Sequence, residues 1–263
     1  MKVTSIVLVA ACLVLPGCAS HPSDDSGLKA VSAPTTGDES PERLRARIHT
    51  ELAANYFEIG NLAVALEEIK EALSADRDFG PAHNVAGLIY AQLKEDRLAE
   101  ESFQRALRIN STDPDAHNNY GIFLCERKQE REAIRHFMVA VRNPLYPTPD
   151  RSYINAGLCA RRSGDPAGAA EFFLLALKLR PNQPQALYQM ADLSYVRGDY
   201  GETKGYLNRL MQAGQSTAEA LWLGVRVERR LGDRNSEASY AKQLRNNYPN
   251  SKEARALIAG QYE

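Results

Sequence analysis

The sequence has no excess of charge of either sign. Its 263 residues include 32 Lys and Arg against 33 Asp and Glu, which gives a formal net charge of −1. Domains that bind nucleic acid usually carry a basic face, often with aromatic residues interleaved, and no such stretch occurs here. The composition therefore gives no support for a nucleic-acid partner.

Motifs of catalysis are also missing. The chain has no glycine-rich phosphate loop, no Cys-x-x-Cys pair and no recognisable spacing of a nucleophile and its base. Repeats, which are described below, fill the chain that remains after a signal peptide is removed. They leave no room for a catalytic domain. We predict a protein that is not an enzyme, with no catalytic residues, no cofactor and no small-molecule substrate.

No apolar run is long enough to span a bilayer as a helix. The longest N-terminal run, residues 6–15, follows the positively charged Lys2 and is typical of a secretory signal peptide, which we assign to residues 1–17. Leu15-Pro16-Gly17-Cys18 resembles a bacterial lipobox, although Pro16 is unusual at its position. The resemblance implies a lipid on Cys18, and Ala19 after it favours the periplasmic face of the outer membrane. An ordinary signal peptide or an uncleaved anchor is the alternative.

Residues 18–39 would then form the lipidated cysteine and a tether. Residues 19–39 are rich in Ser, Asp, Pro, Thr and Gly, and such a segment buries too little apolar surface to offset its ordering entropy. A flexible chain of about 21 residues reaches roughly 25 Å. Ser40-Pro41-Glu42 has a good N-cap, a proline suited to the first helical turn and an acidic residue. We therefore expect one folded domain at residues 40–263.

That domain repeats with a period near 34 residues. Units begin near Ala46, Gly80, Pro114, Asp150, Pro184 and Ala218. Position 8 of each of the first five units is small: Ala53, Gly87, Gly121, Gly157 and Ala191. Position 24 is bulky: Ile69, Phe103, Phe137, Phe173 and Leu207. Small residues let two antiparallel helices approach closely, and the bulky residue fills the space beside them.

These offsets resemble the tetratricopeptide repeat (TPR). The resemblance predicts an all-α fold, a right-handed superhelix of about six helix-turn-helix units with a C-terminal capping helix near residues 252–260. Gly60, Gly164 and Gly198 stand where the first helix of a unit should end in a left-handed residue. The sixth unit looks degenerate, because Gly224 comes one place early and Ala241 replaces the bulky residue.

Two cysteines remain in the repeats, Cys125 and Cys159. An oxidising periplasm would allow them to pair. Neighbouring helix axes lie about 8–10 Å apart, so we favour two buried thiols that pack as small hydrophobic residues.

Three histidines recur at position 4 of successive units: His49, His83 and His117. A metal site would need their nitrogen atoms about 2 Å from one ion, whereas equivalent positions of stacked units lie about 8–10 Å apart. We therefore predict packing residues and no metal.

The first helices of TPR units line the concave face. That face is predicted to bind protein through Asn84, Asn118, Asn119, Arg151, Asn155, Arg161, Gln189 and Tyr195. Asn119, Asn155 and Gln189 share position 6 of three successive units, and such an amide ladder can donate and accept hydrogen bonds along an extended peptide. For any single residue, solvated polar surface is the alternative.

Several stretches carry a closer resemblance. They are Asn118-Asn119-Tyr120-Gly121, residues 143–147, residues 182–184 with 190–193, and residues 221–248. With the lipobox and six units, they resemble the PilF/PilW family of type IV pilus biogenesis lipoproteins. The family implies a pilotin, which helps the outer-membrane secretin of the pilus to localise and multimerise, with secretin or other pilus-assembly proteins as partners. The alternative is a TPR lipoprotein for another envelope assembly, such as outer-membrane protein assembly or peptidoglycan synthesis.

Overall fold

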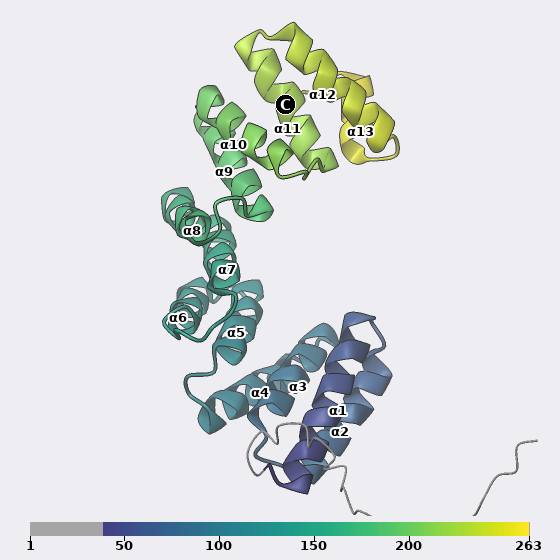
Figure 1. Cartoon of the computed structure of the whole chain (residues 1–263), viewed down its shortest axis with the longest axis vertical. Helices are drawn as coiled ribbons and strands as arrows, with labels where there is room; N and C mark the ends of the chain where they lie inside the picture. Colours follow the sequence, from purple (N-terminus) through teal and green to yellow (C-terminus); the bar gives the residue numbers. More distant parts are fainter. Residues whose placement is uncertain (1–38, 263) are drawn as a thin grey trace, which may run out of the picture. The chain divides into compact units, whose positions relative to one another are not determined.

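The computed structural model describes residues 39–262, which form thirteen α-helices and no strand (Figure 1). The predicted signal peptide, Cys18 and all but the last residue of the predicted tether lie outside the described residues. The helices are α1 (Pro41–Glu58), α2 (Leu62–Ala75), α3 (Gly80–Gln92), α4 (Asp96–Ile109), α5 (Pro114–Glu126), α6 (Glu130–Ala140), α7 (Pro149–Arg162), α8 (Pro166–Leu179), α9 (Pro184–Arg197), α10 (Tyr200–Gln212), α11 (Ala218–Leu231), α12 (Arg234–Asn247) and α13 (Lys252–Ala259).

The helices pack in consecutive pairs, α1 with α2 through α11 with α12, and α13 packs on the last pair. First helices of neighbouring units also touch one another, as α1 does with α3 and α3 with α5. Figure 1 shows the pairs following one another in chain order. This is the predicted all-α solenoid of six helix pairs with a capping helix.

The close approach of the two helices of a unit depends on the predicted small and bulky positions. A Cβ atom added to Gly87, Gly121 or Gly157 would lie 2.5–2.7 Å from the ring sixteen residues further on, which is Phe103, Phe137 or Phe173. All three rings are at most 1% exposed. The phenylalanine therefore occupies the volume that the missing side chain leaves free.

The sixth unit follows the same rule, which corrects its description as degenerate. Gly224 faces Tyr240, where an added Cβ would lie 2.8 Å from the ring. Glycine and ring are again sixteen residues apart, and both are displaced by one place, so Ala241 does not stand at the bulky position. The two helices of the sixth unit therefore keep the same contact, although its two residues lie one position earlier in the unit than in the other five.

The first helix of a unit ends in a left-handed residue whether or not that residue is glycine. Gly164 and Gly198 have φ values of 79° and 87°, as predicted, but Lys94 and Lys128 adopt 64° and 61° at the corresponding places. A side chain with a Cβ is strained in this region. The left-handed conformation of these two lysines therefore lowers the stability of units two and three.

Replacing Lys128 by glycine is expected to stabilise the protein. Relief of the left-handed strain should outweigh the greater freedom of glycine in the unfolded chain, for a net gain of about 0.5–1 kcal/mol. Urea unfolding followed by circular dichroism measures the change. Gly164→Ala is the matched control and should lose a similar amount; a lower midpoint for Lys128→Gly would contradict the account.

Candidate protein-binding surface

Amide side chains from three first helices form one hydrogen-bonded chain. Asn119 Nδ2 on α5 donates to Asn84 Oδ1 on α3 at 3.2 Å, and Asn118 Nδ2 donates to Asn119 Oδ1 at 3.3 Å. Asn118 Oδ1 then accepts from Asn155 Nδ2 on α7 at 3.0 Å and from Ser152 Oγ at 2.8 Å. The structure thus brings four of the predicted site residues together, along the direction in which the units stack.

The predicted ladder of Asn119, Asn155 and Gln189 has a different pattern in the structure. Asn155 bonds to Asn118, and Gln189 belongs to a separate group in which it accepts from Arg161 Nη1. Arg161 Nη2 also forms an ion pair with Asp192 at 2.7 Å. These bonds use only part of the capacity of each amide, which has two N–H donors and a carbonyl oxygen with two lone pairs.

The two remaining predicted residues differ in exposure. Tyr195 is only 9% exposed, and the guanidinium of Arg226 lies 4.4 Å from its ring centroid. Arg151 is exposed in the first turn of α7. Tyr195 therefore supports a neighbouring charged group, whereas Arg151 faces the solvent.

An apolar groove of about 230 Å³ lies between α1, α3 and α5, and we call it the N-terminal groove. Its apolar lining consists of Phe57, Leu88, Ala91, Phe103, Ile122 and Phe123, with Asn119, Gln92, Lys94 and Glu126 as its polar members. Asn119 thus joins the amide chain to this groove. Clefts lined by apolar residues with a few placed polar groups are the usual form of a binding site.

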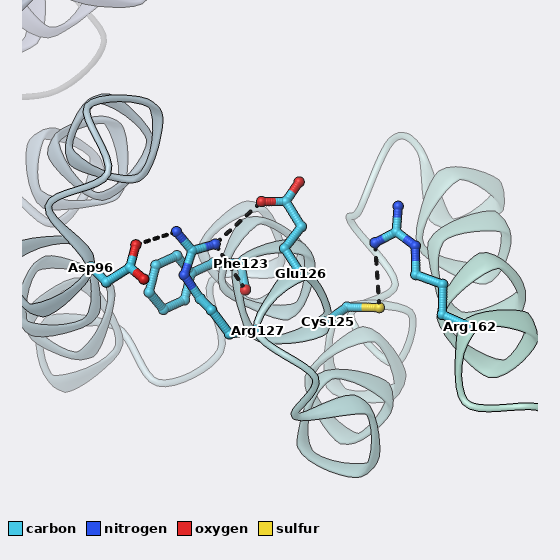
Figure 2. Close-up of polar contacts among 6 residues, drawn as sticks. All are labelled: Asp96, Phe123, Cys125, Glu126, Arg127 and Arg162. Atoms are coloured by element: carbon cyan, nitrogen blue, oxygen red, sulfur yellow. Dashed lines mark hydrogen bonds and ion pairs between the residues drawn. The ribbon is translucent and has the colours of Figure 1, made fainter.

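Arg127 holds Phe123 and Glu126, which line the N-terminal groove. Figure 2 shows its polar contacts. Its guanidinium lies 3.9 Å from the ring centroid of Phe123, donates to the Phe123 carbonyl at 3.3 Å and pairs with Glu126 at 3.2 Å. It also pairs with Asp96 on α4 and holds the pKa of that carboxyl below its usual value, chiefly through the hydrogen bond. Arg127 Nε is buried without a hydrogen-bond partner within residues 39–262. Sequence reasoning missed Arg127, because it lies just after the last residue of the first helix, where the TPR pattern expects no concave-face residue.

Cys125 and Cys159 form a disulfide, so the expectation of two free thiols was wrong. Their Cα atoms are 5.8 Å apart, one on α5 and the other on α7. Helix axes about 8–10 Å apart leave directly facing Cα atoms roughly 3–5 Å apart, because each Cα lies about 2.3 Å from its axis, so slightly offset positions fall within the roughly 4.4–6.8 Å that a disulfide spans. Arg162 Nη1 lies 3.9 Å from the Cys125 sulfur (Figure 2). With Ile122, Asn155 and Leu158, the disulfide lines a shallow hollow beside the amide chain.

The three recurring histidines have separate partners. His49 Nδ1 lies 2.6 Å from Glu68 Oε2, and His83 Nε2 lies 2.9 Å from the Arg77 carbonyl oxygen. His117 Nδ1 lies 2.7 Å from Nδ1 of His136, whose pKa falls to about 4 through burial and through the proximity of His117. Within the described part of the chain, no group of three or more His, Cys, Asp or Glu is arranged to hold a metal ion.

A second apolar and charged region, which sequence reasoning missed, lies between α9, α11 and α13. Tyr188, Asp192, Trp222, Arg226, Lys252 and Glu253 are among the residues that line a hollow of about 370 Å³ there. Burial and the nearby Asp192 raise the pKa of Tyr188 to about 12. The only available signal was Trp222, the single tryptophan of the chain.

Comparison with known proteins agrees with this architecture. Family models described as "Tetratricopeptide repeat" match residues 50–114, 126–184 and 102–135. The "Type IV pilus assembly protein PilF" of Pseudomonas aeruginosa strain PAO1 is 34% identical over 225 residues, which cover 83% of this chain and 89% of that protein. The chain belongs to the PilF/PilW family of TPR proteins.

Two solved structures of this family superpose on most of the chain. Pseudomonas aeruginosa PilF has a TM-score of 0.74 at 32% identity and covers 84% of this chain and 100% of its own. PilW, described as a widely conserved type IV pilus biogenesis factor, has a TM-score of 0.72 at 30% identity and covers 81% of this chain and 98% of its own. The PilF/PilW resemblance drawn from the sequence and the TPR solenoid are thereby confirmed. In residues 39–262, none of the helices combines the length and the apolar character that crossing a bilayer requires.

Proposed function

We propose that the protein serves type IV pilus biogenesis as a scaffold that binds other proteins of the assembly. The observation that carries this proposal is the 34% identity over 83% of the chain to a protein named for type IV pilus assembly. The described surface suits such a role, since it offers amides, arginines and an apolar groove for a polypeptide. A TPR scaffold acts by binding, so we propose no catalytic step.

The proposed location is the periplasmic face of the outer membrane. The support comes from the sequence, in which Leu15, Gly17 and Cys18 resemble a lipobox and Ala19 favours the outer membrane. An acylated Cys18 with two or more chains would give stable anchoring. The segment between Cys18 and α1 would let the solenoid reach proteins some 25 Å from the headgroups.

The proposed partner is the pilus secretin, and the proposed role is that of a pilotin. The first-helix surface, meaning the amide chain with Arg161 and the N-terminal groove, would hold an exposed segment of the secretin. The acyl chains would carry that segment to the outer membrane. Binding would also cover apolar or edge-strand surface that otherwise promotes aggregation. Secretin subunits would then multimerise in the outer membrane.

Replacing Asn119 and Asn155 together by alanine is expected to weaken secretin capture about thirtyfold. Each amide would lose about one hydrogen bond to the bound segment, and a net hydrogen bond contributes about 1 kcal/mol. Pull-down from a detergent-solubilised envelope, with immunodetection of the secretin, measures the effect, and the helical circular dichroism should stay as in the wild type.

The matched control replaces Asn208 and Asn246, which are exposed on second helices. This control should capture the secretin normally. If the Asn119 and Asn155 variant also captures it normally, the amide chain is not the binding surface. The N-terminal groove is then the next candidate, and Phe57, which lines it, is the residue to replace, together with its neighbour Tyr56.

A further inference from the structure

The last described residues fold back onto the first helix of the sixth unit. Gly260 ends α13 with a φ of 68°, and the chain then turns so that the Tyr262 ring stacks on Trp222 with centroids 5.6 Å apart. The guanidinium of Arg229 lies 4.0 Å from the centroid of the Tyr262 ring. Arg226 Nε donates to the Tyr262 carbonyl at 3.1 Å. Three side chains of α11 thus hold an aromatic residue and its backbone.

The tail forms one wall of a hollow that is lined by arginines. Tyr195, Arg226, Arg229 and Arg230 line this hollow of about 640 Å³ together with residues 260–262. Among residues 39–262, three arginines and no carboxylate line it; Arg229 pairs with Glu237, and Arg230 is also engaged. The volume lies within the usual range for ligand pockets, about 300–1,000 Å³. A basic hollow of this size favours a negatively charged occupant.

Arg226 is the residue that points most directly to a ligand. It is half-buried, its guanidinium lies over the Tyr195 ring at 4.4 Å, and it lines the hollows on both sides of it. Within residues 39–262 it has no carboxylate partner, and its Nε is bonded to a neutral carbonyl. A guanidinium presents further N–H groups in a planar fork that matches a carboxylate.

We propose that the surface of α11 beside this hollow, where Trp222, Arg226 and Arg229 hold the tail, binds an acidic peptide segment with an aromatic side chain, supplied by another protein. The tail of residues 260–262 competes for the same place. The tail shows which groups fit: a ring between an indole and a guanidinium, and an acceptor oxygen at Arg226. An incoming carboxylate would add the attraction of an ion pair to this hydrogen bond and would accept from two N–H groups of the guanidinium at once. While the tail holds this surface of α11, the apparent affinity for the ligand is reduced by the fraction of molecules in which the surface is free.

This binding site is distinct from the amide chain and the N-terminal groove, and the inference does not depend on a role in pilus biogenesis. The single tryptophan provides a direct measurement, because Trp222 is in contact with the tail. The full chain in detergent is titrated with an acetylated, amidated peptide that has one tyrosine between two runs of three aspartates. We expect a saturable change in tryptophan emission, and no such change with the same peptide carrying lysines in place of the aspartates.

Two variants distinguish the contribution of Arg226 to ligand binding from the competition by the tail. A chain truncated after Ala259 should bind the acidic peptide several-fold more tightly, because the competitor is gone. Arg226→Gln should bind it about tenfold more weakly, the effect of losing one charge-assisted hydrogen bond. Arg245→Gln, an exposed arginine on α12, is the control and should bind like the wild type.

Should Arg226→Gln lower the thermal midpoint, Tyr262→Ala takes its place, since it removes the competing ring from the end of the chain and should tighten binding. The proposal is overturned if the truncated chain binds no more tightly than the wild type. It is equally overturned if the lysine peptide binds as well, or if emission changes with protein concentration alone, which would make a second copy the occupant.

Discussion

Replacing Cys125 and Cys159 together by alanine is expected to lower the free energy of unfolding by about 4 kcal/mol. The disulfide closes a loop over a sequence separation of 34 residues, and the chain-entropy estimate for such a loop is about 4 kcal/mol. Alanine keeps both positions small and apolar, so little packing is lost with the bond. Urea unfolding followed by circular dichroism measures the difference.

The bond should also determine how cooperatively the solenoid unfolds. Units of a repeat protein contact chiefly their neighbours, and this disulfide joins unit three to unit four through α5 and α7. Without it, the units before and after should begin to unfold at different urea concentrations. Wild-type protein treated with a reductant under denaturing conditions and refolded should behave like the variant. Equal midpoints for the oxidised wild type and the variant would contradict this account.

Replacing Gly157 by alanine is expected to cost about 3 kcal/mol, at the upper end of the range for overpacked cores. The new Cβ would lie 2.5 Å from the ring of Phe173, which is 0% exposed and therefore has no free space to move into. The two helices of unit four would have to separate. The loss of stability is measured by urea unfolding.

Gly205→Ala is the matched control, because Gly205 lies inside α10 with nothing within 4 Å of an added Cβ. Alanine is the better helix former, so this variant should gain about 0.5–1 kcal/mol. Opposite signs for the same chemical change would show that the contact with Phe173, and not helix propensity, requires glycine at residue 157. A loss at Gly157 no larger than the change at Gly205 would refute the packing rule.

The sequence predicted the fold because the rule that organises it is local and repeated. Small and bulky residues sixteen places apart, such as Gly121 and Phe137, specify the contact within each helix pair. The sixth unit does not fit a fixed 34-residue register, and for that reason it looks degenerate in the sequence. Gly224 and Tyr240 are both displaced by one place, and their spacing, which is what packing requires, is unchanged.

The contacts between units were harder to predict. Sequence spacing places Asn118 and Asn155 on first helices, but it does not specify the rotation that brings these two amides together. The disulfide depends on the same rotation, which turns Cys125 towards Cys159. Nothing in the sequence indicated that Tyr262 would stack on Trp222, because this contact depends on a turn after the last helix.

The central proposal, a scaffold that escorts the pilus secretin to the outer membrane, is tested most directly by the secretin itself. Secretin multimers are measured on mildly heated gels of separated membranes from the wild type, from a strain lacking this gene and from one carrying Cys18→Ser. The account predicts monomeric secretin without the gene, and misplaced or poorly assembled secretin with Cys18→Ser, although that variant folds normally. Normal amounts of secretin multimer in the outer membrane without this protein would contradict it.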